Sequence, residues 1–109
     1  MTAITENNLH GFEKKYLKGL AHNLKPVVFV GKNGMTDAVV RSTEQALTTH
    51  ELIKIRFIDF KEKALKQEIM AGIQQRTAAD MVSMVGHTAV LYRQHADPEK
   101  RKIQLPVRK

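Results

Sequence analysis

The sequence predicts a single α/β domain in which helices pack on a mixed four-stranded sheet. Two observations lead to this fold class. The hydrophobic patterns follow the order α-β-α-β-α-β-β, and a chain of 109 residues has room for one domain. Each strand–helix–strand crossover should be right-handed and make its strands parallel, whereas the last two strands must form an antiparallel hairpin. The predicted sheet therefore contains both kinds of pairing.

We expect the first helix at residues 9–24, where apolar residues recur every three or four positions. It should stop before Pro26, because the residue that precedes a proline is pushed towards extended geometry. The arc opposite its apolar residues is basic and contains Lys14, Lys15, Lys18 and His22. The segment is therefore predicted to be an amphipathic helix with a cationic outer surface.

Two further helices are expected. One follows Thr36, a suitable N-cap, and runs to about His50 with Asp37 in its first turn. The other covers about residues 61–75 and has a weaker pattern. Its residues expected to point inward are Leu65, Ile69 and Ile73.

The predicted strands differ in their burial patterns. Residues 27–30 are apolar throughout, which is typical of a strand buried on both faces. Residues 52–58 alternate apolar and basic side chains, as a strand with one buried face does. Residues 81–85 and 88–93 read as two strands joined by a tight turn at Gly86-His87.

These elements place the predicted domain at residues 9–106. Residues 1–8 are polar and expected to be flexible, and residues 107–109 form a basic C-terminal end. The tail from His95 onward is polar and basic, although residues 103–105 are suited to a short extended piece.

The chain is strongly basic, with a formal net charge of +7 and a pI near 9.9. Residues 1–35 carry five lysines against two acids, and residues 96–109 carry five basic residues against two acids, so each end contributes +3. Such a balance attracts nucleic acids, anionic membranes or acidic proteins. A solvated surface would carry the same charges, so charge alone does not decide between these partners.

Several function classes are disfavoured. The absence of cysteine excludes disulfides, thiol catalysis and Cys-ligated metals, and the five histidines lack metal-binding spacing. Catalytic and nucleotide-binding motifs are missing, so we expect no enzyme, cofactor or small-molecule substrate. No apolar run approaches the roughly 20 residues that span a bilayer, and the N-terminal residues do not resemble a signal peptide. The expected location is the cytoplasm.

The segment Gly31-Lys32-Asn33-Gly34 carries the functional prediction. Asn33-Gly34 alone would suggest a hairpin, but the spacing that follows is helical, so the loop joins a strand to a helix N-terminus. Unpaired N–H groups attract anions there, and glycines remove the Cβ atoms that would hold a sugar–phosphate chain away. Lys32 adds charge, and Asn33 offers a donor and an acceptor, as in the GXXG loop of KH domains. The negative charge of Asp37 in the first helical turn offsets part of the attraction of this helix end for anions.

Three runs then resemble the CRM domain, the YhbY-like RNA-binding family: LKGLAHNLKPVVFVGKNGMT at 17–36, ELIKI at 51–55 and VGHTAVLYR at 85–93. The resemblance spans roughly residues 12–106, and the family's GxxG loop falls on Gly31–Gly34. It implies a fold similar to the C-terminal domain of translation initiation factor 3. It also implies RNA binding and, for stand-alone bacterial members, association with pre-50S particles. Two residues depart from the family pattern: Met35 replaces the usual leucine, and His87 a common basic residue.

We therefore expect an RNA-binding protein, monomeric, whose partner is ribosomal RNA or a large-subunit precursor that it helps to assemble. The loop makes the main contact through Lys32 and Asn33, with Gly31 and Gly34 allowing close approach. Residues of second rank for phosphate contact are Lys14, Lys15, Lys18, Lys25 and Arg41, and His22 joins them because it shares the lysine arc. Lys54, Arg56 and the tail bases rank lower.

Two alternatives stay open: a module that binds acidic proteins, and a basic amphipathic helix that binds a membrane surface. The aromatic residues are expected mostly in the core rather than stacked on bases; they are Phe12, Tyr16, Phe29, Phe57, Phe60 and Tyr92. Recognition of RNA backbone and shape is accordingly favoured over reading of bases.

Overall fold

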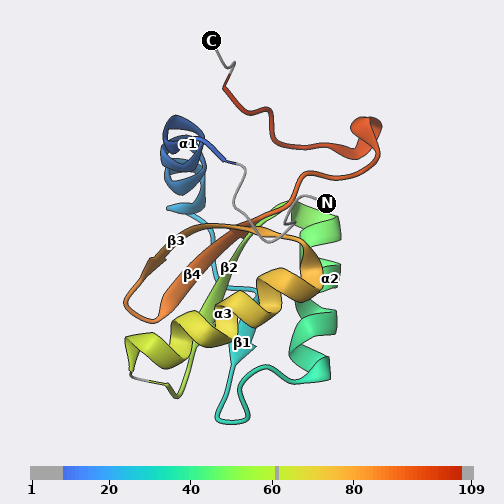
Figure 1. The fold of residues 1–109 in the computed structure, drawn as a ribbon. Coiled ribbons are helices and arrows are strands. Elements are labelled where there is room, and N and C mark those ends of the chain that lie inside the picture. Colours follow the sequence, from blue (N-terminus) through green and yellow to red (C-terminus); the bar gives the residue numbers. More distant parts are fainter. Residues whose placement is uncertain (1–8, 61, 107–109) are drawn as a thin grey trace, which may run out of the picture.

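The computed structural model describes residues 9–60 and 62–106 (Figure 1). The elements follow in the order α1 (Gly11–Ala21), β1 (Val28–Val30), α2 (Asp37–His50), β2 (Leu52–Phe57), α3 (Lys63–Thr77), β3 (Asp80–Val85), β4 (Thr88–Tyr92) and the 3₁₀ helix η1 (Pro98–Lys100). The predicted order α-β-α-β-α-β-β is thus confirmed. The expectations for residues 1–8 and 107–109 lie outside the described residues.

The sheet has four strands in the order β1-β2-β4-β3. β1 pairs with β2 in parallel, and β4 pairs antiparallel with both β2 and β3. β2 and β3 therefore run in the same direction with β4 inserted between them. This arrangement confirms the predicted mixed sheet.

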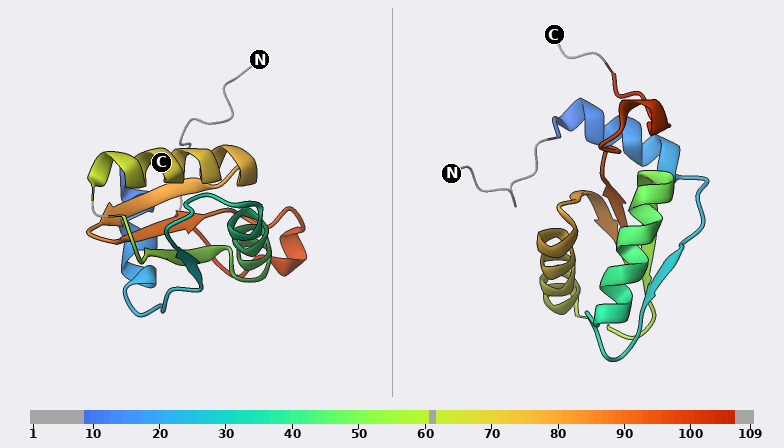
Figure 2. Two further views of the ribbon diagram at one scale, coloured as in Figure 1. Left: turned by 90° about the horizontal axis from the view of Figure 1, so that it is seen from below. Right: turned by 90° about the vertical axis from the view of Figure 1, so that its right-hand side faces the viewer.

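The two faces of the sheet are covered unequally. On one face, side chains of α2 and α3 such as Leu47, Met70 and Ile73 pack on the alternate residues of the strands and form the larger core. On the other face, α1 contributes Leu17 and Ala21 to a smaller cluster. Because α1 lies at one end of the molecule, it covers only part of its face (Figures 1 and 2).

The prediction that residues 27–30 are buried on both faces is wrong. β1 is an edge strand whose Val28 and Val30 face the larger core, while the side chain of Phe29 points the other way and is 51% exposed. The reason is topological: an edge strand has one neighbour, and α1 does not extend over β1. A continuous apolar run cannot reveal this, since periodicity is lost when every residue is apolar.

Two helices differ from their predicted extents. α1 ends at Ala21, and the ammonium of Lys54 donates a hydrogen bond to the carbonyl of His22 at 3.3 Å, just past the helix end. α3 ends at Thr77 because Ala78 adopts a left-handed conformation with φ of 59°.

The inward side of α3 also differs from the prediction. Leu65 is 40% exposed, and its neighbour Lys66 is buried instead. The Lys66 ammonium donates to the carbonyl of Gly86 at 2.6 Å, so the lysine ties α3 to the β3–β4 turn. A hydrophobic pattern would not select a lysine for this position, because lysines are almost never fully buried without a partner.

The C-terminal tail is attached by the buried carboxylate of Glu51, at the corner between α2 and β2. Its Oε2 accepts a hydrogen bond from the N–H of His95 at 2.7 Å, and its Oε1 accepts from Lys102 at 2.7 Å and Ile103 at 3.0 Å. Residues 103–105 form no strand; Ile103 and Leu105 pack on the smaller core cluster.

Candidate nucleic-acid interface

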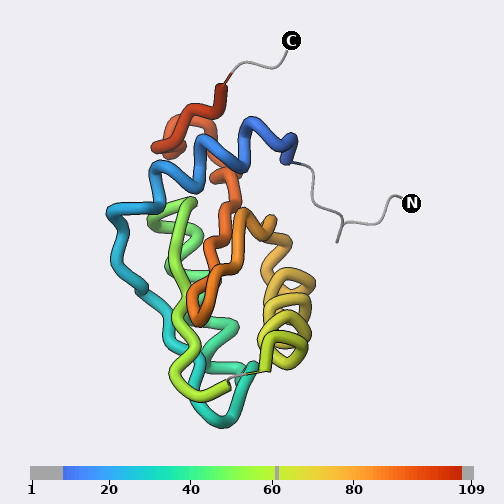
Figure 3. Tube along the Cα trace, turned by 90° about the vertical axis from the view of Figure 1, so that its left-hand side faces the viewer, coloured from blue at the N-terminus to red at the C-terminus, as the bar shows by residue number. Residues whose placement is uncertain are grey.

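The loop at residues 31–34 is a tight turn at the end of the molecule opposite α1 (Figures 1 and 3). The N–H of Gly34 donates to the carbonyl of Gly31 at 3.0 Å, which places Lys32 and Asn33 at the exposed tip. β1 leads into the turn and α2 begins three residues after it. The predicted strand-to-helix position of the loop is therefore confirmed.

The base of the loop is anchored against α3. Gly34 is buried with φ of +67°, and a Cβ built there would lie 3.6 Å from Ile69 and 3.7 Å from Phe60. Next to it, the side chain of Met35 packs so close to α3 that a Cβ at Gly72 would lie 2.8 Å from its sulfur. The tip thus projects from a fixed base.

The two glycines of the loop have different roles. Gly34 is required by its left-handed backbone, a conformation that costs other residues energy. Gly31 does not have this conformation, and a Cβ placed on it would meet nothing within 4 Å. Of the two, Gly31 is therefore the one that leaves open space beside the exposed tip.

The helix N-terminus beside the loop is only partly available to an anion. As predicted, Thr36 caps α2: its hydroxyl accepts a hydrogen bond from the N–H of Val39 at 3.1 Å. Helix geometry leaves the first N–H groups, those of Asp37 and Ala38, unpaired within the helix. The carboxylate of Asp37 lies 3.5 Å from Arg76 in an exposed ion pair, which weakens the negative charge at this end.

The structure separates the predicted site into two clusters. The loop cluster consists of the loop and Arg41, which is exposed one turn into α2. The α1 cluster lies at the other end of a molecule whose longest dimension is 41 Å, and it comprises Lys14, Lys15, Lys18 and His22 (Figure 3). The predicted residues therefore do not form one continuous patch.

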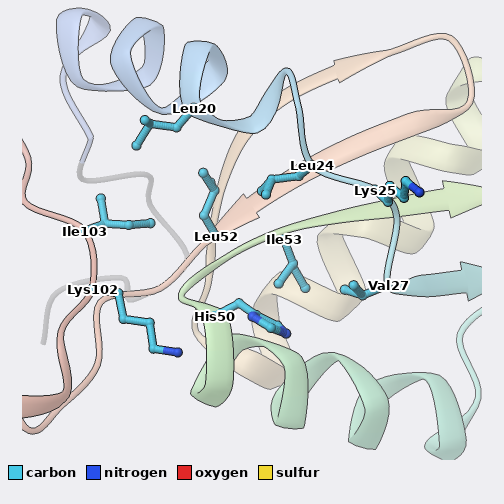
Figure 4. Close-up of a pocket in the computed structure, with 9 residues that line it drawn as sticks. All are labelled: Leu20, Leu24, Lys25, Val27, His50, Leu52, Ile53, Lys102 and Ile103. Atoms are coloured by element: carbon cyan, nitrogen blue, oxygen red, sulfur yellow. The ribbon is translucent and has the colours of Figure 1, made fainter.

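Lys25 belongs to neither cluster. It lies in the segment between α1 and β1, at an apolar cavity of about 460 Å³ (Figure 4). Leu24, Leu52 and Ile103 face this space from three different segments, with Lys102 and His50 nearby. Its lining is mostly aliphatic, which does not suit a phosphate.

Three aromatic side chains contradict the expectation of core packing. Phe57 and Tyr92 are buried and Phe60 is half-buried, but Phe12, Tyr16 and Phe29 are 43%, 42% and 51% exposed. Burial raises the pKa of the Tyr92 hydroxyl to about 12, so this group stays protonated. The basic residues Lys54 and Arg56 lie on the same face of the sheet as Phe29. The alternation of residues 52–58 suggested that the two basic residues share a face, but not that Phe29 joins them.

Within the residues that the structure describes, no group of three His, Asp or Glu side chains is arranged to hold a metal ion. Nor is any described helix both long enough and apolar enough to cross a membrane.

A basic α/β domain with a cationic, glycine-flanked turn in front of a helix resembles the loops that bind phosphate groups in other folds, such as KH domains. Comparison with known proteins identifies the family. The model of the CRS1/YhbY (CRM) domain family matches residues 9–93, and the chain belongs to this family.

Proteins from several organisms are similar to this chain. The chain is 46% identical over 94 residues to a protein of Haemophilus influenzae named "RNA-binding protein", covering 86% of this chain and 91% of that one. It is 32% identical over 98 residues to the "Probable RNA-binding protein YqeI" of Bacillus subtilis, and the match covers 90% of this chain and 99% of that protein. The solution structure of the protein SAV1595 from Staphylococcus aureus superposes on this structure with a TM-score of 0.75 at 28% sequence identity. The match covers 90% of this chain and 99% of that one. The fold is thus shared with a solved structure.

Proposed function

We propose that this protein binds RNA, and that its target is ribosomal RNA in precursors of the large ribosomal subunit. One observation carries the proposal: the exposed pair Lys32 and Asn33 projects from an anchored base beside the open space at Gly31. A lysine ammonium and an amide can both donate to phosphate oxygens, and the missing Cβ lets a backbone approach closely. The names of the Haemophilus influenzae and Bacillus subtilis relatives support the same ligand.

The binding can be tested with labelled fragments of ribosomal RNA in an anisotropy titration. Lys32→Gln should weaken binding at low salt and reduce the dependence of log K on log salt by about 0.7, the value of one phosphate contact to a single strand. Ser42→Ala, an exposed change on α2, is the control for surface substitutions. An unchanged salt dependence in Lys32→Gln would remove the loop from the interface.

The cellular target needs a separate measurement. Tagged protein should sediment with large-subunit precursors in a sucrose gradient, and crosslinked RNA should map to ribosomal RNA. Crosslinks spread over unrelated transcripts would contradict the ribosomal target while leaving RNA binding in place.

Adsorption to a membrane surface is a second candidate, supported by one observation. Phe12, Tyr16 and Leu20 form an exposed row along α1, next to Lys15. Flotation with anionic liposomes tests this candidate. This candidate would be established if the native protein bound the vesicles and Phe12→Ser abolished that binding without changing the affinity for RNA.

A further inference from the structure

The face of the sheet that α1 covers only in part has an open region, formed by Phe29, Lys54, Arg56, Thr88 and Val85. α1 packs on Leu52 and Tyr92 at one end of this face. The open region begins beyond the end of α1, where Lys54 bonds to the carbonyl of His22.

The register of the strands places four of these residues in one row. Phe29 is paired with Arg56, Arg56 with Thr88, and Thr88 with Val85. With strands about 4.8 Å apart, the row crosses roughly 14 Å. Its two ends lie on the edge strands, where Phe29 is 51% and Val85 64% exposed. An exposed phenylalanine therefore stands on an accessible face of the sheet, paired in register with an arginine of the neighbouring strand.

A basic depression adjoins the row. Lys18 of α1, His22 just past the end of α1 and Lys54 of β2 line it together with Val85 and Thr88, and its volume is about 350 Å³. Among the described residues that line it, none is acidic. The open region thus has apolar and aromatic surface in the row, with cationic groups beside it.

We infer that the open region binds unpaired nucleotides, with a base stacked on Phe29 and phosphates near Arg56, Lys54 and Lys18. A ring lying on a sheet can stack only on the face of a base, and base faces are accessible when the strand is unpaired. The arginine beside it adds charge and a planar group that stacks. A sheet of the same strand number stacks two or three bases in RRM domains.

The position of Phe29 connects this surface to the rest of the molecule. Phe29 precedes Gly31 by two residues, so its Cα is about 7 Å from the loop along an extended chain. A strand held at the loop can continue over Phe29 and Arg56 towards Lys18 and His22. The inference rests on the proposed RNA binding and adds to it the form of RNA that is bound: a single-stranded segment.

The test compares two labelled probes, a single-stranded RNA of about 12 nucleotides and a duplex of the same length, a size within the range of single-strand binding folds. Phe29→Ala should lower the affinity for the single strand by about 5- to 150-fold, the value of one stacked base, and change duplex binding by less than about twofold. Phe29→Tyr should retain the affinity of the native protein. Leu65→Ala, a similarly exposed apolar residue on α3, is the matched control and should bind as the native protein does.

A spectroscopic signature separates stacking from a structural effect. The chain has no tryptophan, so Phe29→Trp introduces a single reporter whose fluorescence should be quenched by the single strand and not by the duplex. If Phe29→Ala binds the single strand as well as the native protein does, the inference is overturned while RNA binding stands. Failure of the native protein to bind either probe would instead overturn the proposed function. Quenching of Phe29→Trp by apolar peptides but not by RNA would assign the open region to a protein partner.

Discussion

The two glycines of the loop should separate the stability of the fold from the binding of RNA. Gly34→Ala forces a Cβ into a left-handed conformation with φ of +67°, which costs about 1–2 kcal/mol. The nearest side-chain atoms, of Ile69 and Phe60, lie at 3.6 and 3.7 Å, so no clash adds to this cost. For a domain of this size the melting temperature should fall by roughly 4–16 °C.

Gly31→Ala should behave in the opposite way. Its Cβ enters open space, and the substitution restricts the unfolded chain, so stability should stay equal or rise by up to about 1 kcal/mol. Gly31→Asp places a negative charge beside the proposed phosphate. At 4 Å like charges repel by about 1 kcal/mol in water and by about 4 kcal/mol near a protein surface, which predicts at least about a fivefold loss of RNA affinity.

The assays are thermal denaturation followed by circular dichroism and anisotropy titration with RNA, both performed on Gly31→Ala, Gly31→Asp and Gly34→Ala. Gly34→Ala should bind RNA with near-native affinity at temperatures where it remains folded. If Gly31→Ala destabilised the domain as much as Gly34→Ala does, the division of roles between the two glycines would be refuted. Native RNA affinity in Gly31→Asp would refute the contact at the loop.

Two further predictions concern the anchors of the fold, and both are checked by urea denaturation. Glu51→Gln keeps the shape of the side chain but presents an amide to backbone donors, so it should lose about 1.5–3 kcal/mol, whereas the exposed change Glu99→Gln should be neutral. Burial alone would raise the pKa of Glu51, but its three backbone hydrogen bonds lower the pKa below the ordinary value of 4.5. The ionised carboxylate therefore stabilises the fold fully at pH values above 4.5. As the pH falls through the lowered pKa of Glu51, the difference in stability between the native protein and Glu51→Gln should shrink. Lys66→Met leaves the carbonyl of Gly86 without its hydrogen-bond donor, so the free energy of unfolding should fall by about 1–3 kcal/mol. Amide exchange in the β3–β4 hairpin should become faster. Unchanged exchange there would show that the lysine does not hold the turn.

Much of this architecture follows from local pattern. The helical spacing after residue 36 correctly placed the loop in front of a helix, and Thr36 caps that helix as its side chain suggests. These features are local, because they depend on residues within one turn of each other. They are therefore accessible to sequence reasoning.

The errors concern long-range packing. The exposure of Phe29 depends on the strand order and on how far α1 extends, which no local pattern contains. The burial of Lys66 depends on a carbonyl twenty positions later in the chain, and the role of Glu51 depends on the tail folding back to it. The separation of α1 from the loop at residues 31–34 likewise follows from the placement of α1 at the far end of the sheet (Figure 3).

This separation sets a length dependence for the proposed binding. The longest dimension of the molecule, 41 Å, is an upper limit on the distance between the loop cluster and the α1 cluster. A stacked strand advances about 3.4 Å per nucleotide, so about twelve nucleotides (41 divided by 3.4) are enough to reach from one cluster to the other. If both clusters contact RNA, short oligonucleotides occupy one cluster at a time, whereas longer ones engage both and gain from effective concentration. Affinity should then rise with oligonucleotide length up to about this limit.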